Sequence, residues 1–95
     1  MSIEALTAKY ISMAEKVFSE LKRNQSPISL TEETVADVLN YANDYLQDAK
    51  YYKAQGNLET SLTSVAYCEG LLDALRLIGA VNFEWPTKPE PKKLS

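Results

Sequence analysis

The chain has 95 residues, which is enough for one domain with a modest hydrophobic core. Its formal net charge is −3, and the first 81 residues carry 7 Lys or Arg against 11 Asp or Glu, a balance of −4. An acidic body of this kind argues against nucleic-acid binding, because nucleic acids are bound by basic surfaces that neutralise phosphates. No apolar run approaches the ~20 residues that a membrane-spanning helix needs, so no membrane partner is expected.

The single cysteine, Cys68, limits both the stabilising cross-links and the chemistry of the chain. One thiol cannot form an intrachain disulfide, and the sequence contains no histidine that could complete a zinc site or activate a nucleophile. The side chain is therefore expected to act as a small buried hydrophobe. A lone thiol fits a reducing cytoplasm, and neither a cofactor nor a metal ion is expected.

The first predicted helix covers residues 3–23. Its apolar residues recur at helical spacing and fall within an arc of roughly 140°. They are Ile3, Leu6, Tyr10, Met13, Ala14, Val17, Phe18 and Leu21. Ser2 is placed to cap the amino-terminal end of this helix. Pro27 keeps Ser26 out of helical dihedral angles, so residues 24–29 are predicted to form a loop.

A second helix is predicted over residues 32–55. Thr31 is a suitable N-cap, while Ser29 with Glu32 forms a competing capping box, so two starting points are open. One face of this helix is apolar and consists of Val35, Val38, Leu39, Ala42, Tyr45, Leu46 and Ala49. Gly56 suits the left-handed position that commonly ends a helix.

Asn57 is placed to cap a third helix that begins at residue 58, and Gly79 is placed to end it. The apolar stripe of this helix runs through Leu58, Leu62, Val65, Cys68, Leu72 and Leu75. Because only Gly56 and Asn57 separate the second and third helices, the two must form a tight antiparallel hairpin. The first helix is expected to cover the remaining apolar surface. The sequence thus predicts an all-α antiparallel three-helix bundle over residues 1–81.

Residues 82–95 are predicted to form an extended to disordered tail, since they are rich in proline and lysine. Just before Pro86, however, Val81, Phe83 and Trp85 alternate with polar residues, which places three apolar side chains on one side of an extended segment. We expect this segment to dock, either against its own bundle or on a second subunit, and order to fade after Pro86.

Much of the chain resembles a small archaeal helical family known as domain of unknown function 357. The resemblance rests on the run Asp44-Tyr45-Leu46-Gln47-Asp48-Ala49-Lys50-Tyr51-Tyr52, on Gly56-Asn57, and on the run from Ala66 to Arg76 followed by Gly79. The matching positions are Tyr45, Asp48, Ala49, Tyr67, Glu69, Gly70, Leu72, Asp73 and Ala74. The resemblance spans roughly residues 5–80 and implies a short helical bundle from an archaeon. It implies no activity.

Two acidic pairs at i,i+4 spacing stand out on the second and third helices. Glu69 falls inside the apolar arc of the third helix, where a carboxylate needs a partner or a wet edge. Asp73 follows it as a like charge, which Arg76 is placed to offset. Counting outward from the turn puts Asp44 level with Glu69, and Asp48 pairs with Asp44 along the second helix. A salt-bridge network at a helix seam is the structural interpretation of these residues.

Tyrosines accompany these carboxylates, and tyrosine on a polar surface is common at protein interfaces. The candidate binding face comprises Tyr41, Asp44, Tyr45, Asp48, Tyr67, Glu69 and Asp73. Gly70 lies in the middle of the third helix, where glycine costs about 1 kcal/mol relative to alanine. Such a glycine is expected where another helix approaches closely, either from the same chain or from a partner.

Two functional hypotheses follow. The first is a small non-enzymatic protein-interaction or assembly domain that binds a protein partner or itself. The second is a metal-dependent hydrolase of a phosphorylated small molecule, because hard cations such as Mg²⁺ bind paired carboxylates. The direction of Asp44, Asp48, Glu69 and Asp73 distinguishes them, since an enzyme needs these groups to converge on one site.

Overall fold

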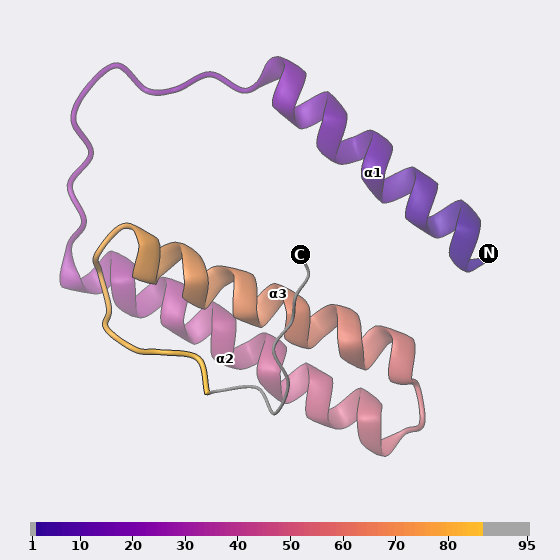
Figure 1. Ribbon diagram of the computed structural model, residues 1–95. Coiled ribbons are helices and arrows are strands. Elements are labelled where there is room, and N and C mark those ends of the chain that lie inside the picture. Colours follow the sequence, from indigo (N-terminus) through magenta and orange to yellow (C-terminus); the bar gives the residue numbers. More distant parts are fainter. Residues whose placement is uncertain (1, 87–95) are drawn as a thin grey trace.

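The computed structural model describes residues 2–86, which hold three α-helices and no strand. The helices are α1 (Ile3–Glu20), α2 (Glu32–Ala54) and α3 (Leu58–Leu77). Figure 1 shows α2 and α3 side by side as an antiparallel hairpin, with α1 joined to them by a long connection. The all-α class, the three helices and the tight hairpin are confirmed. The predicted disorder beyond Pro86 concerns residues outside the described range.

Side-chain caps fix where the first two helices begin. The Ser2 hydroxyl accepts a hydrogen bond from the Ala5 amide at 3.0 Å. Thr31 does the same for Thr34, also at 3.0 Å, so Thr31 is the cap of α2 and the competing box at Ser29 is not used. Each cap satisfies one of the amide groups that a helix start leaves without an intrahelical partner.

The turn between α2 and α3 is set by Gly56, whose φ of +82° lies in the left-handed region. The Asn57 amide donates to the Tyr52 carbonyl at 2.9 Å, and the Gly56 amide donates to Lys53 at 3.0 Å. These two bonds are the Schellman pattern. The Asn57 side chain then accepts from the Thr60 amide at 3.3 Å and starts α3. Because one residue ends α2 and the next begins α3, α3 must fold back along α2.

The same pattern recurs at Gly79, whose φ is +83°, beyond the end of α3. Here the Ala80 amide donates to Leu75 at 2.8 Å and the Gly79 amide donates to Arg76 at 3.1 Å. The left-handed residue turns residues 80–86 back along the hairpin, so that they run beside it (Figure 1). The expected docking of this segment on its own hairpin is described below.

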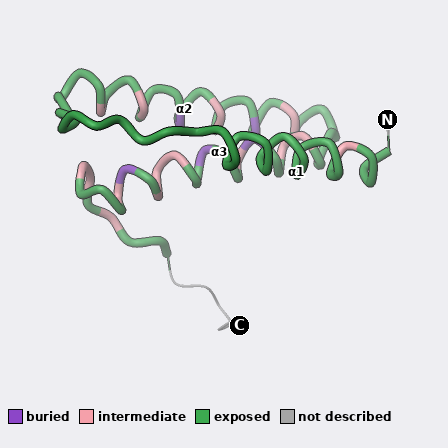
Figure 2. Tube along the Cα trace, turned by 90° about the horizontal axis from the view of Figure 1, so that it is seen from above, coloured by how far each residue is buried: buried purple, intermediate pink, exposed green. Residues whose placement is uncertain are grey.

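Mostly small side chains, with one leucine, form the contact between α2 and α3. The buried residues are Ala42 and Ala49 on α2 and Ser64, Cys68 and Leu75 on α3. Figure 2 shows them on the facing sides of the two helices. The Ser61 hydroxyl crosses this contact and donates to the Ala49 carbonyl at 2.7 Å. We call this contact the seam. Its burial of Cys68 agrees with the expectation from sequence, whereas the serines were absent from the predicted stripe.

Helix α1 lies apart from the hairpin, which differs from the expectation that it covers the remaining apolar surface. Within residues 2–86, no Cα of α1 comes within 8 Å of a Cα of α2 or α3. Nothing in α1 is buried, and the tube in Figure 2 is exposed along nearly its whole length. The radius of gyration is 16.2 Å, against about 12 Å for a compact chain of this length. The long connection, residues 21–31, allows this separation.

The two kinds of glycine give opposite predictions. Gly56→Ala forces a β-carbon into the left-handed region and should destabilise the hairpin by about 1–2 kcal/mol. Gly70 lies within α3, where an added β-carbon meets no atom within 4 Å, so Gly70→Ala should stabilise by up to ~1 kcal/mol. Thermal unfolding followed by circular dichroism measures both. A harmless Gly56→Ala, or a destabilising Gly70→Ala, would contradict this description of the two sites.

Candidate functional site

Two of the candidate tyrosines meet across the hairpin. The rings of Tyr45 and Tyr67 lie edge to face, with their centroids 4.5 Å apart. Tyr45 is half-buried, while Tyr67 remains exposed. Tyr41, one turn before Tyr45, is 62% exposed. The structure therefore joins Tyr45 and Tyr67 on one side of the hairpin, which we call the tyrosine side, and leaves Tyr41 open to solvent.

The four candidate carboxylates do not converge on one site. Asp44, Asp48 and Glu69 are exposed, and Asp73 is half-buried with partners of its own. Within the described part of the chain, no three acidic or thiol side chains are grouped closely enough to hold a metal ion. Glu69 reaches solvent because α2 packs on the side of α3 that carries Ser64 and Cys68, which turns the predicted apolar arc partly outward.

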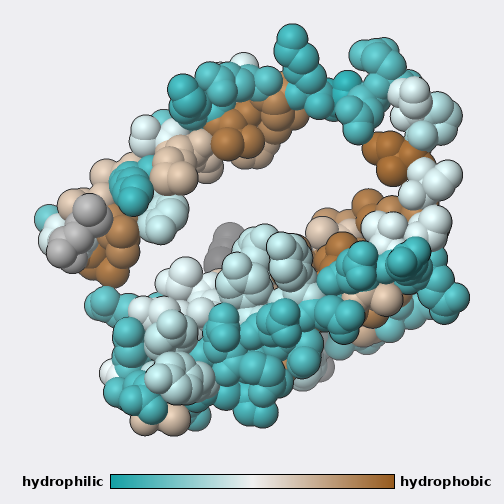
Figure 3. Space-filling model, turned by 180° about the vertical axis from the view of Figure 1, so that it is seen from behind, coloured by the Kyte–Doolittle hydropathy of each residue, from teal (hydrophilic) through white to brown (hydrophobic). Residues whose placement is uncertain are grey.

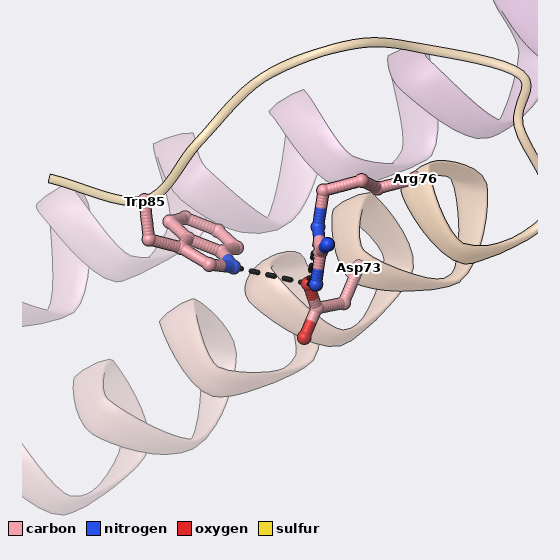
Figure 4. A network of polar contacts seen from close by, with 3 residues as sticks. All are labelled: Asp73, Arg76 and Trp85. Carbon is pink, nitrogen blue, oxygen red and sulfur yellow. Dashed lines mark hydrogen bonds and ion pairs between the residues drawn. The ribbon is translucent and has the colours of Figure 1, made fainter.

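Asp73 is the centre of a polar cluster that the tail completes (Figure 4). The Trp85 indole N–H donates to Oδ1 of Asp73 at 3.0 Å. Arg76 donates to the same oxygen from Nη2 at 2.8 Å and from Nε at 3.2 Å. The expected offset of Asp73 by Arg76 is thus present. The Trp85 contact could not be read from the sequence, because the two residues lie twelve positions apart.

Aromatic packing supports the same cluster. The Phe83 and Trp85 rings are edge to face at 4.9 Å, and the Arg76 guanidinium lies 5.7 Å from the centre of the Phe83 ring. Phe83 and Val81 are half-buried. The segment predicted to dock therefore lies on α3 of its own chain, held by one charged hydrogen-bond acceptor and by aromatic contacts.

Hydrogen bonds lower the pKa of Asp73 below the ordinary value of an aspartate. The bond from Trp85 contributes most, and the bonds and charge of Arg76 act in the same direction. Both donors favour the ionised carboxylate. The contribution of this group to stability is therefore present above the pKa of the unfolded chain, and it is lost as the pH falls through the lowered pKa of the folded state.

Cys68 has the opposite shift, because burial raises the pKa of its thiol and the nearby negative charge of Glu69 adds to the effect. The thiol is buried in the seam. A raised pKa keeps it protonated at neutral pH, and a protonated thiol is a poor nucleophile and a poor metal ligand. This environment matches a packing role for Cys68.

Gly70 is exposed, and no other part of the described chain approaches it closely. The expected close helix contact is thus not made within the chain between residues 2 and 86. A contact between Gly70 and a helix of a partner stays a prediction.

An extended apolar surface lies on α1, at residues that, Ile11 apart, the sequence analysis assigned to the apolar arc. Ile3, Tyr10, Ile11, Met13, Val17, Phe18 and Leu21 are all exposed, Phe18 by 80%. Figure 3 shows this apolar surface along the side of α1 that faces the hairpin. We call it the α1 face. Contiguous exposed apolar surface marks interaction sites in folded proteins. The amphipathic periodicity of the sequence indicates that α1 has an apolar side. The periodicity alone does not say which surface of the protein or of a partner covers that side.

None of the helices among residues 2–86 combines the length and the apolar character needed to cross a membrane. A chain of three helices, with a tight hairpin and a docked tail segment, is a small all-α domain. Residues 9–81 match the family described as protein of unknown function (DUF357). The chain belongs to this family. No curated protein and no solved structure matches it.

The tail contact predicts an acid transition in Trp85, the only tryptophan. As the pH falls through the lowered pKa of Asp73, the indole loses its charged acceptor, so emission should shift to the red below the ordinary aspartate pKa. Asp73→Ala should give red-shifted emission already at neutral pH and abolish the acid transition.

Asp48→Ala removes an exposed carboxylate on α2 and is the matched control, for which we expect the wild-type emission and transition. Steady-state fluorescence during an acid titration measures all three proteins. If Asp73→Ala gives the wild-type emission at neutral pH, the contact between Asp73 and Trp85 does not hold the tail.

Proposed function

We propose that this protein is a small non-enzymatic interaction or assembly domain that binds a protein partner, or a second copy of itself, through the α1 face. The observation that carries the proposal is the exposure of the apolar stripe of α1, whose large side chains are not covered by another helix within residues 2–86. An amphipathic helix that lays its apolar face on a partner is a recurring mode of protein recognition.

The energetics of the hairpin support the same proposal. The hairpin has few buried residues and most of them are small, and no large side chain within residues 2–86 is fully buried. Each large apolar side chain that moves from water into a contact contributes about 1.5–3 kcal/mol. The α1 face and the hairpin therefore both gain from a further packing partner, and no chemistry is needed to explain the residues involved.

The hydrolase alternative has less support. Asp44, Asp48 and Glu69 point separately into solvent, and Asp73 is engaged by Arg76 and Trp85. A metal-dependent hydrolase requires several oxygen ligands around one cation. We accordingly favour binding over catalysis, and we place the protein in the cytoplasm of an archaeon on the basis of its lone thiol and its family resemblance.

The proposal is tested by affinity capture of the tagged protein from its native cells. Tyr10→Glu with Val17→Glu places two charges in the middle of the α1 face and should reduce every specifically retained protein at least about tenfold, because a buried unpaired carboxylate is costly. Ala8→Glu with Ser12→Glu adds the same charge to the opposite side of α1 and should leave capture unchanged. Equal capture by wild type and the first variant would show that the α1 face is not the binding surface.

A further inference from the structure

The hairpin has an uncovered apolar side opposite its tyrosines. Tyr45 and Tyr67 define the tyrosine side by their ring contact. Leu46 follows Tyr45 and lies about 100° further around α2. On α3, Leu62 and Leu58 lie five and nine positions before Tyr67, which places them roughly 140° and 180° around the helix from it. Leu46, Leu58 and Leu62 thus form one apolar strip, which we call the leucine flank.

The leucine flank is among the most exposed apolar surface of the hairpin. Leu58 is 64% exposed and Leu62 is 69% exposed, while Leu46 is exposed to a smaller extent. The tail segment does not relieve this exposure, because Phe83 and Trp85 engage Arg76 and Asp73 nearer the far end of α3. A helix that packs along this surface would remove the leucines from water, which is favourable in free energy.

The α1 helix of the same chain lies opposite the tyrosine side of the hairpin, so it does not cover the leucine flank. A cleft of about 610 Å³ separates the two parts, with Ile3, Leu6, Tyr10 and Ile11 of α1 on one wall and Thr60 and Thr63 of α3 on the other. Thr60 and Thr63 lie seven and four positions before Tyr67, so they belong to the tyrosine side. The apolar residues of α1 are opposite hydroxyl groups here, and the leucine flank remains open.

Charge favours contact between α1 and a hairpin over contact between two hairpins. Helix α1 contains Lys9 and Lys16 against Glu4, Glu15 and Glu20, a balance of −1, and the connection adds Lys22 and Arg23, whereas residues 32–79 contain 3 Lys or Arg and 8 Asp or Glu, a balance of −5. Two hairpins therefore repel each other more strongly than α1 and a hairpin do, and the two basic residues of the connection are attracted to a hairpin. Such differences in electrostatic energy select between possible partners.

The geometry of the connection allows α1 to reach a second molecule. Residues 21–31 are eleven residues outside any helix, which span up to about 36 Å when extended. Helix α1 is ~27 Å long, so a contact strip ~10 Å wide covers about 270 Å² on each of the two surfaces that meet. Two reciprocal contacts therefore hide roughly 1,100 Å² in total. Specific interfaces need about 1,000 Å² or more, so a pair of such contacts is sufficient.

We propose that two copies of this chain exchange α1, so that the α1 face of each copy packs on the leucine flank of the other. The proposal rests on the proposed function, which assigns binding to the α1 face, and it names the partner as a second copy. Two-fold exchange closes the assembly, because each copy gives one helix and receives one. It also covers both apolar surfaces that a single chain leaves open.

Complementary variants test the exchange in the full-length protein. Val17→Glu disables the α1 face but keeps the leucine flank, and Leu62→Glu does the reverse; both positions are exposed, so neither change disturbs the seam. By sedimentation equilibrium, wild type should give the mass of a dimer at micromolar concentration, and each variant alone should give the mass of a monomer. An equimolar mixture restores one of the two contacts, because the intact α1 of one variant meets the intact flank of the other. Mixed dimers should therefore form at a higher concentration than wild type needs, at which each variant alone is still a monomer.

Ser12→Glu and Thr63→Glu add the same charge beside the two test positions but outside the proposed contact, and both should remain dimers. Circular dichroism checks that every variant keeps its helices. Monomeric wild type overturns the exchange, and so does a dimer that persists in either variant alone, or a mixture that associates no more than the separate variants at any concentration. The broader interaction function fails separately, only if the α1 variants retain the same partners as wild type from native cells.

Discussion

The close contact of α2 and α3 along small side chains is the constraint on which the rest of the structure depends. Ala42 and Ala49 face Ser64 and Cys68, and the Ser61 hydroxyl ties the Ala49 carbonyl to the opposite helix at 2.7 Å. Small residues let two helices approach closely, but they bury little apolar area. The leucines beside the seam are therefore pushed to its edge, and the large apolar residues of the chain are left on the surface of α1 and of the hairpin. A pair of helices with so small a core gains little stability from its own packing, which is why we propose that a further helix packs on it.

Local chemistry made most helix ends predictable from the sequence, although α1 ends at Glu20 and not at the predicted residue 23. Ser2, Thr31 and Asn57 cap the three helices, and Gly56 and Gly79 end two of them, because each of these residues satisfies a specific backbone need of a helix terminus. It was harder to predict from the sequence which side of α3 meets α2. Hydrophobic periodicity points to the most apolar arc, through Leu58 and Leu62, whereas the tight seam selects Ser61 and Ser64, a little further around the helix. The placement of α1 could not be predicted either, since a periodic apolar stripe shows that a helix needs a cover without showing which surface provides it.

Among the candidate binding residues, too, some contacts could be predicted from the sequence spacing and others depend on the fold. Asp73 and Arg76 could be paired from their spacing, but Trp85 reaches Asp73 only because Gly79 reverses the chain and returns the tail along α3. Tyr45 and Tyr67 meet because the Gly56 turn sets the register of the hairpin. Asp44, Asp48 and Glu69 stay apart, since they lie outside the seam on helices that present them to solvent. The family to which the chain belongs has no assigned function, so the proposal of an interaction domain rests on the exposed apolar surfaces and not on any resemblance to a protein of known activity.

The central claim is that α1 lacks support from its own hairpin and is stabilised by a second copy. An isolated helix of this length is marginally stable in water, so its amide protons exchange rapidly unless a partner covers it. Hydrogen exchange of the full-length protein, measured by mass spectrometry at low and high protein concentration, tests this directly. The account predicts that protection of residues 3–20 rises clearly with protein concentration, because dimer formation follows mass action. Protection of α1 that is strong and independent of concentration would contradict it, since that result would place the cover of α1 within a single chain.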